Sequence, residues 1–193
     1  MHKLVLASGS PRRKELLAQL GYTFDVVLPD IEECKAEQET AAEYVLRLSQ
    51  QKAQAGLALV SESSIVVGSD TVVVGSDTVV VCDGQVLEKP HHFADAQRML
   101  TQLSDRRHQV MTAVTVVSAE KQHSIVVTTE VWFKKLTQEE IEQYWQSGEP
   151  CDKAGSYGIQ GLGGRFVTRI EGSYSAVVGL PLYETDQLLH EFI

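Results

Sequence analysis

The chain has 193 residues, of which 43% are hydrophobic and 22% charged, a balance typical of a globular protein with its own core. Its formal net charge is −9, whereas proteins that bind nucleic-acid polymers are normally basic, so we expect no nucleic-acid partner. No apolar run is long enough to cross a membrane or to serve as a signal peptide. The cysteines Cys34, Cys82 and Cys151 form no metal-binding or paired spacing, which favours reduced thiols in a cytoplasmic protein.

The chain begins with a predicted strand, a tight turn and a helix. The strand covers residues 3–7 and the helix residues 12–20. Ser10 suits the N-cap, Pro11 the first helical position and Gly21 the C-terminal stop. This order is typical of α/β proteins and places backbone N–H groups at the carboxyl end of a strand.

Helices and strands alternate along the rest of the chain. Strands are expected at residues 23–28, 109–118, 124–135 and 165–170, with a short one before Lys89. Helices are expected from a Thr40–Glu43 capping box to residue 59, and at 93–103, 137–146 and 183–192. Residues 29–39 are acidic, and residues 152–164 form a glycine-rich loop. The alternation predicts an α/β fold with a mixed sheet, in one domain over residues 1–193 without a separable linker.

A perfect tandem repeat interrupts this pattern. Residues 66–72 read VVGSDTV, and residues 73–79 read the same. The valine-rich run is far longer than a usual strand of about 5–6 residues. Either one copy is looped out, or the segment folds back around Gly75-Ser76. Seven residues of strand span about 23 Å and reverse the side-chain face, so Asp70 and Asp77 cannot share one site.

Arg12 and Arg13 occupy the first turn of the first helix. Cations there are disfavoured by about 0.3–1 kcal/mol each, because they meet the positive end of the helix dipole. The arrangement is explained if the helix start faces a phosphate, where N–H groups and guanidinium groups converge on one anion. The alternative is a pair of solvated arginines on an exposed turn.

Lys52 and several carboxylates are further candidates. Lys52 continues an apolar stripe of the second helix, so it faces the protein body, either to bind a ligand or as a lysine at the core edge. Asp70 and Asp77 follow Gly-Ser after valine-rich strands, a place for ligand-binding carboxylates but also ordinary turn chemistry. Glu32 and Glu33 offer oxygen ligands for a hard cation, or are solvated charges.

Three further polar residues, at positions 89, 153 and 160, are candidates. Lys89 ends a short strand, and Lys153 opens the stretch DKAGSYGIQGLGG, whose glycines let a backbone approach a ligand closely. The amide of Gln160 both donates and accepts hydrogen bonds, as recognition of a base edge requires. Neither GxxxxGK[ST] nor GxGxxG occurs.

The chain resembles the Maf family of nucleotide pyrophosphatases. The matching blocks run in family order: LASGSPRRKELL (6–17), LRLSQQKA (46–53), GSDTVVVCDGQVLEKP (75–90), HQVMTAV (108–114), EPCDKAGSYGIQG (149–161), GSY (172–174) and VVGLP (177–181). Within the family the Arg-Arg, Asp-Thr and YGIQG blocks are most similar to the subgroup acting on dTTP and UTP. The subgroup acting on 7-methyl-GTP differs in the first helix turn and in the glycine-rich block.

The resemblance implies an elongated Maf/ITPase-like mixed sheet flanked by helices, with two lobes and a cleft that binds the triphosphate. It also implies a cytoplasmic homodimer that uses Mg²⁺ or Mn²⁺. The family's G-[AS]-D-T aspartate is the proton acceptor; Arg12, Thr78 and Gln160 match positions associated with substrate choice. The positions that line the phosphate and metal site are Ser8, Arg13, Glu33, Lys52, Lys89 and Lys153.

The repeat leaves the aspartate open. Asp77 is favoured as the catalytic residue and, with Glu33, as a metal ligand, because its copy alone continues into the family's turn and Lys-Pro; Asp70 is the alternative. The predicted reaction is attack of water on the α-phosphorus of dTTP, UTP or a modified pyrimidine nucleotide, with loss of pyrophosphate. The alternatives are a 7-methyl-GTP pyrophosphatase and a non-catalytic nucleotide-binding regulator of cell division, inactivated by the repeat.

Overall fold

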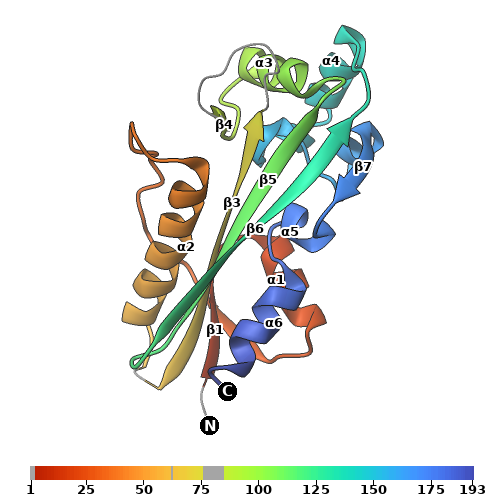
Figure 1. Ribbon diagram of the computed structural model, residues 1–193. Helices are drawn as coiled ribbons and strands as arrows, with labels where there is room; N and C mark the ends of the chain where they lie inside the picture. Colours follow the sequence, from red (N-terminus) through yellow and green to blue (C-terminus); the bar gives the residue numbers. More distant parts are fainter. Residues whose placement is uncertain (1–2, 62, 76–84) are drawn as a thin grey trace. The chain divides into compact units, whose positions relative to one another are not determined.

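The computed structural model describes residues 3–61, 63–75 and 85–193 (Figure 1). In chain order the elements are β1 (Lys3–Ala7), α1 (Pro11–Gln19), β2 (Phe24–Val27), α2 (Ala41–Ala58), β3 (Ser64–Gly75), β4 (Gln85–Leu87), α3 (Phe93–Leu103), β5 (Arg107–Val117), β6 (Gln122–Phe133), α4 (Gln138–Gln146), β7 (Val167–Glu171), α5 (Tyr174–Val178) and α6 (Leu182–His190). Short 3₁₀ turns cover Glu149–Asp152, Ala154–Ser156 and Leu162–Phe166. Within these described ranges, none of the helices combines the length and the apolar character that a membrane crossing requires.

The strands form one mixed sheet, which confirms the predicted α/β class. The strand order is β2-β1-β3-β5-β6-β7, and β4 pairs with β3. β1 runs parallel to both β2 and β3, whereas β4 is antiparallel to β3 and β7 antiparallel to β6. Parallel neighbours joined through helices, followed by hairpins, explain why strands and helices alternate in the first half of the chain.

The chain divides into two compact units. Unit 1 comprises Met1–Thr71, Thr112–Val127 and Gly179–Ile193, and unit 2 comprises Val72–Met111 and Thr128–Val178. The single domain and the cleft between lobes that the sequence suggested stay predictions.

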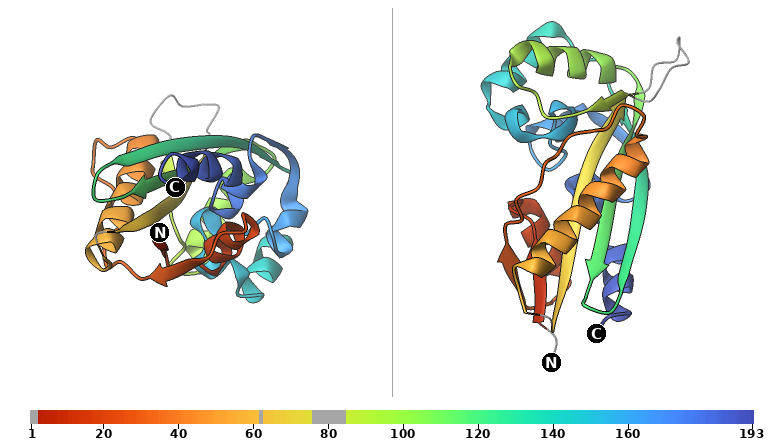
Figure 2. Two further views of the ribbon diagram at one scale, coloured as in Figure 1. Left: turned by 90° about the horizontal axis from the view of Figure 1, so that it is seen from below. Right: turned by 90° about the vertical axis from the view of Figure 1, so that its left-hand side faces the viewer.

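In unit 1, α2 lies against the sheet (Figure 2). Its buried face joins Val5 and Val66 in one apolar core. Gly68 of β3 permits the close approach, because a Cβ there would lie 2.4 Å from the carbonyl oxygen of Ser49 and 2.5 Å from the amide nitrogen of Ala53. The helix and β3 are therefore locked together by backbone contact, and this fixes which side chains of the two elements meet.

In unit 2 the core is aromatic. Phe133 and Tyr157 pack edge to face, with ring centroids 4.7 Å apart, and Tyr144 packs in the same way on Phe166 at 5.0 Å. Such pairs add about 0.5–1.5 kcal/mol each beyond their burial. The glycine-rich segment is joined to this core, because it contains Tyr157 and because the backbone N–H of Gly158 donates to Tyr144 OH at 3.0 Å.

Local sequence signals predicted most element boundaries to within one to three residues. The N-caps Ser10, Thr40 and Thr137 accept hydrogen bonds from the third helical residue, and the last two form complete capping boxes. Gly21 has φ of +80°, as expected for a helix stop. The helix α5 was not predicted: its five residues are too few to show a helical period.

The structure describes residues 66–75 of the repeat, and both the looped-out copy and the hairpin around Gly75-Ser76 stay predictions. β3 has twelve residues, which include the whole first copy and the first three residues of the second. It pairs with β4 through Val73↔Leu87, Val74↔Val86 and Gly75↔Gln85. The expected catalytic Asp77 and the expected substrate-binding Thr78 lie outside the described residues.

Candidate active site

Lys52 joins two carboxylates in unit 1. Its Nζ lies 2.7 Å from Asp70 Oδ1 and 2.8 Å from Glu33 Oε1. Lys52 and Asp70 are both buried, at 8% and 7% exposure. A buried charge is tolerated only when it is paired, so each of these side chains requires the other. The group carries one more negative than positive charge, which favours a further cation close by.

All four residues of the first Gly-Ser-Asp-Thr copy make specific contacts. Gly68 packs on the backbone of α2, and Asp70 pairs with Lys52. Ser69 Oγ donates to the carbonyl oxygen of Gly179 at 3.1 Å. Thr71 Oγ1 accepts from Arg13 Nη2 at 3.3 Å. The first copy is therefore fitted into its surroundings residue by residue.

Arg13 lies beside this strand, at the start of α1. Its Nε donates to the carbonyl oxygen of Gly179 at 2.9 Å, and its other nitrogen reaches Thr71. Burial lowers the pKa of the Arg13 guanidinium, and the negative charge of Asp70 opposes that shift. Arginine stays protonated in proteins, so a positive charge is held next to Asp70 by contacts to the protein itself.

The turn before α1 has the predicted geometry. Ser8 is buried, at 7% exposure, and its Oγ accepts from the backbone N–H of Ser10 at 3.2 Å. Ser10 in turn caps α1 by accepting from the N–H of Arg13. Arg12 is half-buried in the same first turn. Unit 1 thus brings together Arg13, Lys52, Asp70 and Glu33, with Ser8 and Arg12 on the turn beside Arg13.

In unit 2 a single carboxylate organises the glycine-rich loop. Glu149 accepts hydrogen bonds from Tyr144 OH at 2.7 Å, Leu162 N–H at 2.8 Å and Gly163 N–H at 3.0 Å. A Cβ on Gly161 would lie 2.3 Å from Glu149 Oε2. The loop that carries Gln160 therefore packs closely around this carboxylate, and a Cβ at residue 161 would displace the Glu149 side chain from its hydrogen bonds.

The electrostatics of Glu149 agree with this role. Burial raises the pKa of Glu149, but the hydrogen bonds from Gly163, Tyr144 and Leu162 outweigh it, so the net pKa is lowered. Burial and the neighbouring carboxylate raise the pKa of Tyr144, which stays protonated and able to donate. Sequence reasoning did not select Glu149; the one available signal was an acidic residue just before a run of glycines.

The expected ligand residues of unit 2 differ in their contacts. Lys153 Nζ donates to the carbonyl oxygen of Glu149 and to Asp152 Oδ1, both at 2.8 Å. Gln160 and Lys89 are exposed, Gln160 in the glycine-rich loop and Lys89 just after β4. Lys153 and Gln160 thus belong to one loop ordered by Glu149, whereas Lys89 lies outside that loop, just after β4.

The carboxylates of Glu33 and Asp70 are suited to a metal ion that arrives with a phosphate ligand. Within residues 3–61, 63–75 and 85–193, no group of three or more His, Cys, Asp or Glu side chains could hold an ion alone. Glu33 and Asp70 meet at one ammonium, so two carboxylates are close together. Mg²⁺ is commonly bound by one or two carboxylates plus substrate phosphates and water, and this pair fits that pattern.

Comparison with known proteins points to one family. Residues 3–192 match the family model described as "Maf-like protein". The chain is 96% identical over 193 residues to a dTTP/UTP pyrophosphatase of Vibrio vulnificus (strain YJ016), with all of both chains covered. It is 54% identical over 192 residues to a dTTP/UTP pyrophosphatase of Salmonella typhimurium, covering 100% of this chain and 94% of that one.

Among solved structures, one that matches the chain is a nucleoside-triphosphatase, or dITP/XTP pyrophosphatase, from Mycobacterium abscessus. It is 19% identical, with a TM-score of 0.48, and the alignment covers 98% of this chain and 94% of that one. The family assignment comes from the sequence matches, which span the chain from end to end. The chain belongs to the Maf family.

Proposed function

We propose that this protein hydrolyses dTTP and UTP to the nucleoside monophosphate and pyrophosphate. The observation that carries the proposal is the buried Lys52–Asp70 pair with Glu33, set beside Arg13 at the start of α1. Cations and carboxylates interleaved in this way suit a polyphosphate that arrives with a divalent ion. Relatives up to 96% identical over their full length carry the name dTTP/UTP pyrophosphatase, which supports the choice of substrate.

The reaction divides among a few side chains. Arg12, Arg13 and Lys52 of unit 1 neutralise the phosphate oxygens, on which negative charge develops as pyrophosphate leaves, and Lys89 and Lys153 stay predicted phosphate contacts. An aspartate of the repeat accepts a proton from the attacking water, and Ser8 lines the turn that receives the phosphates. Glu33 and the same aspartate would hold Mg²⁺ or Mn²⁺, which would supply positive charge to neutralise the triphosphate.

The geometry supports Asp70 as that aspartate. The sequence favoured Asp77 because its copy continues into the family's turn and Lys-Pro. In the structure it is the first copy that pairs with Lys52 and reaches Arg13 through Thr71. By the same reasoning Thr71 takes the place expected for Thr78, with Gln160 selecting the pyrimidine edge through its amide.

Two substitutions decide between the copies. Asp70→Asn should reduce pyrophosphate release from dTTP with Mg²⁺ by about 10²–10⁴-fold, the usual contribution of a positioned acid or base. Asp77→Asn is the matched control, since it makes the same change in the same local sequence, and should leave release close to wild type. The reverse ranking would move the site to the second copy, and retained activity in both variants would refute a catalytic aspartate in the repeat.

A substrate panel separates the remaining alternatives. We expect dTTP and UTP, or a modified pyrimidine triphosphate, to be the best substrates, and 7-methyl-GTP to be poor. Binding of dTTP without pyrophosphate release under any divalent metal would instead indicate a regulator of cell division. The names of the relatives favour neither alternative. The homodimer, the cytoplasmic location and the absence of nucleic-acid partners stay predictions.

A further inference from the structure

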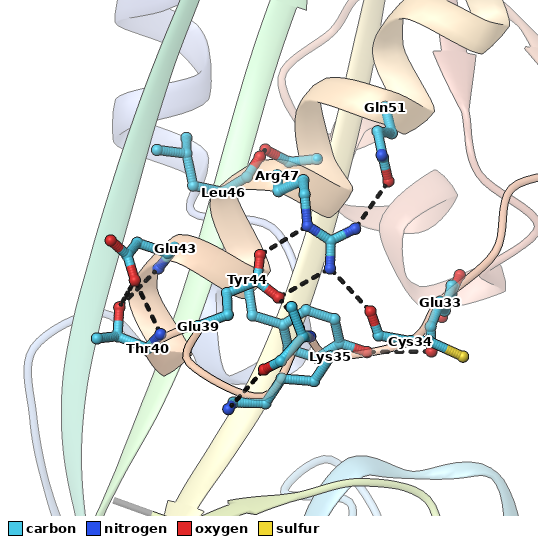
Figure 3. Close-up of polar contacts among 12 residues, drawn as sticks. Glu33, Cys34, Lys35, Glu39, Thr40, Glu43, Tyr44, Leu46, Arg47 and Gln51 are labelled. Atoms are coloured by element: carbon cyan, nitrogen blue, oxygen red, sulfur yellow. Dashed lines mark hydrogen bonds and ion pairs between the residues drawn. The ribbon is translucent and has the colours of Figure 1, made fainter. Parts of the chain in front are cut away.

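The segment that carries Glu33 has no regular structure of its own. Residues 28–40 connect β2 to α2 without helix or strand. A glutamate on such a segment would lose considerable conformational entropy on binding a ligand, unless other contacts already hold its backbone. Glu33 is nonetheless placed 2.8 Å from the ammonium of Lys52. Something must therefore fix the segment, and Figure 3 shows that the contacts come from α2.

One guanidinium holds most of this segment (Figure 3). Arg47 Nε and Nη2 form a fork on the carboxylate of Glu39, at 2.6 and 2.8 Å. Nη2 also donates to the carbonyl oxygen of Cys34 at 2.8 Å, and Nη1 donates to Gln51 Oε1 at 3.2 Å. Two-point pairing of this kind is directional as well as strong. Arg47 thus ties residue 34 and residue 39 to the same turn of α2.

Two further contacts complete the clamp. Glu39 Oε2 accepts from the backbone N–H of Ala36 at 3.1 Å, so the carboxylate held by Arg47 also orders the middle of the segment. Tyr44 OH donates to the backbone carbonyl of Glu33 at 3.2 Å. The guanidinium of Arg47 lies over the Tyr44 ring, 5.5 Å from its centroid.

The pairing is supported by the electrostatics of its members. The hydrogen bond from Arg47 lowers the pKa of Glu39, and the same contact raises the pKa of Arg47. Both side chains therefore keep their charges across the neutral range. A lysine could replace the charge of Arg47 but not its planar fork, which engages the Glu39 carboxylate and the Cys34 carbonyl together.

We propose that Arg47 is a positioning residue for the metal–triphosphate site: by holding Cys34 and Glu39 against α2, it presents Glu33 to the cation. The proposal rests on the assignment of Glu33 as a metal ligand in the proposed function. Partners that orient a metal ligand typically change metal affinity by about 10–100-fold when they are removed. Arg47→Ala should accordingly weaken metal binding although Arg47 is not itself a ligand.

The first test measures binding without turnover. Titration calorimetry of the full chain with Mn²⁺, in the presence of α,β-methylene-dTTP, reports metal affinity directly, since that analogue cannot release pyrophosphate. We expect about tenfold weaker binding for Arg47→Ala, and binding that is still weakened for Arg47→Lys. Arg169→Ala is the control, because it removes an arginine from an exposed ion pair with Glu171 and should leave the affinity unchanged.

A double substitution tests whether Arg47 acts through Glu33. If it does, Arg47→Ala adds little further loss in the E33Q background. An equal loss with and without Glu33 would overturn the proposal. If E33Q alone does not weaken Mn²⁺ binding, the metal assignment in the proposed function fails, and this proposal fails with it. If E33Q weakens binding and Arg47→Ala does not, only the role of Arg47 is refuted.

Hydrogen exchange provides a readout of the clamp itself. In Arg47→Ala the amides of residues 33–39 should exchange faster than in wild type, while those of β3 stay protected. Glu39→Gln offers a milder variant if Arg47→Ala folds poorly, since it removes the charge of the pair and keeps its volume. It should change exchange and Mn²⁺ affinity in the same direction. Unchanged exchange in both variants would show that Arg47 does not hold the segment.

Discussion

Deleting one copy of the seven-residue repeat should stabilise the protein and leave its activity in place. Removal of residues 66–72 or of residues 73–79 produces the same polypeptide, because the two copies are identical. The product keeps one Gly-Ser-Asp-Thr-Val, followed directly by Val80, Val81 and Cys82. These three residues would then take the places that Val73–Gly75 hold opposite β4.

The size of the effect follows from the hairpin register. At present the last pair is Gly75↔Gln85, so nine residues connect the paired positions. After the deletion only Asp83-Gly84 remain between Cys82 and Gln85, and Asp-Gly is a favoured two-residue hairpin turn. Shortening the connection from nine residues to two lowers the entropic free-energy cost of closing the loop by (3/2)RT ln(9/2), about 1.3 kcal/mol. In a chain of this size, that corresponds to a rise in Tm of about 2–5 °C.

Thermal unfolding followed by circular dichroism, with pyrophosphate release from dTTP measured in parallel, tests this reasoning. The matched control replaces residues 76–82 with a Gly-Ser sequence of equal length, which removes the last four residues of the second copy, including Asp77, but keeps the length of the connection. It should show no rise in Tm. A deletion variant that melts below wild type, or that loses activity while folded, would refute the view that one copy is sufficient for fold and activity.

Three further outcomes are expected. Lys52→Met leaves Asp70 buried without its cation, so urea unfolding should show a loss of about 3–5 kcal/mol; a neutral result would mean that the pair is solvated. Gly68→Ala drives a methyl group against the backbone of α2 and should cost about 1–3 kcal/mol in the same measurement. Burial lowers the pKa of His108 to about 3, whereas the unfolded chain has a His pKa of about 6.5. Between those values only the unfolded state binds the proton, so stability should fall with decreasing pH by up to about 1.4 kcal/mol per pH unit. His108→Phe should flatten that slope in urea unfolding at several pH values, and parallel slopes for the two proteins would contradict it.

The structure adds a constraint on how the glycine-rich loop can vary. A larger residue at position 161 is disfavoured because its Cβ would lie close to the Glu149 carboxylate, and not because of the backbone conformation of Gly161. Gln160 next to it is exposed. A substitution at residue 160 should therefore disturb the loop less than one at residue 161.

Local chemistry made much of the fold predictable from the sequence. The limits of α1, α2 and α4 follow from side chains that hydrogen-bond to backbone groups three residues away, so each cap can be recognised without knowledge of the rest of the chain. The inward direction of Lys52 follows equally from the spacing of its helix. The candidate cations Arg12 and Arg13 were found because they oppose the helix dipole, a conflict that is also local.

Only the tertiary structure decided which residues the candidate side chains contact. Nothing near Lys52 in the sequence indicates that its partner is Asp70, because that choice depends on the packing of Gly68 against α2. The identical copies of the repeat have identical local preferences, so only the pairing of β3 with its neighbouring strands could place one of them beside Lys52. Glu149 and Arg47 were not identified from the sequence for the same reason. The backbone and side-chain groups that they contact are brought to them by the fold.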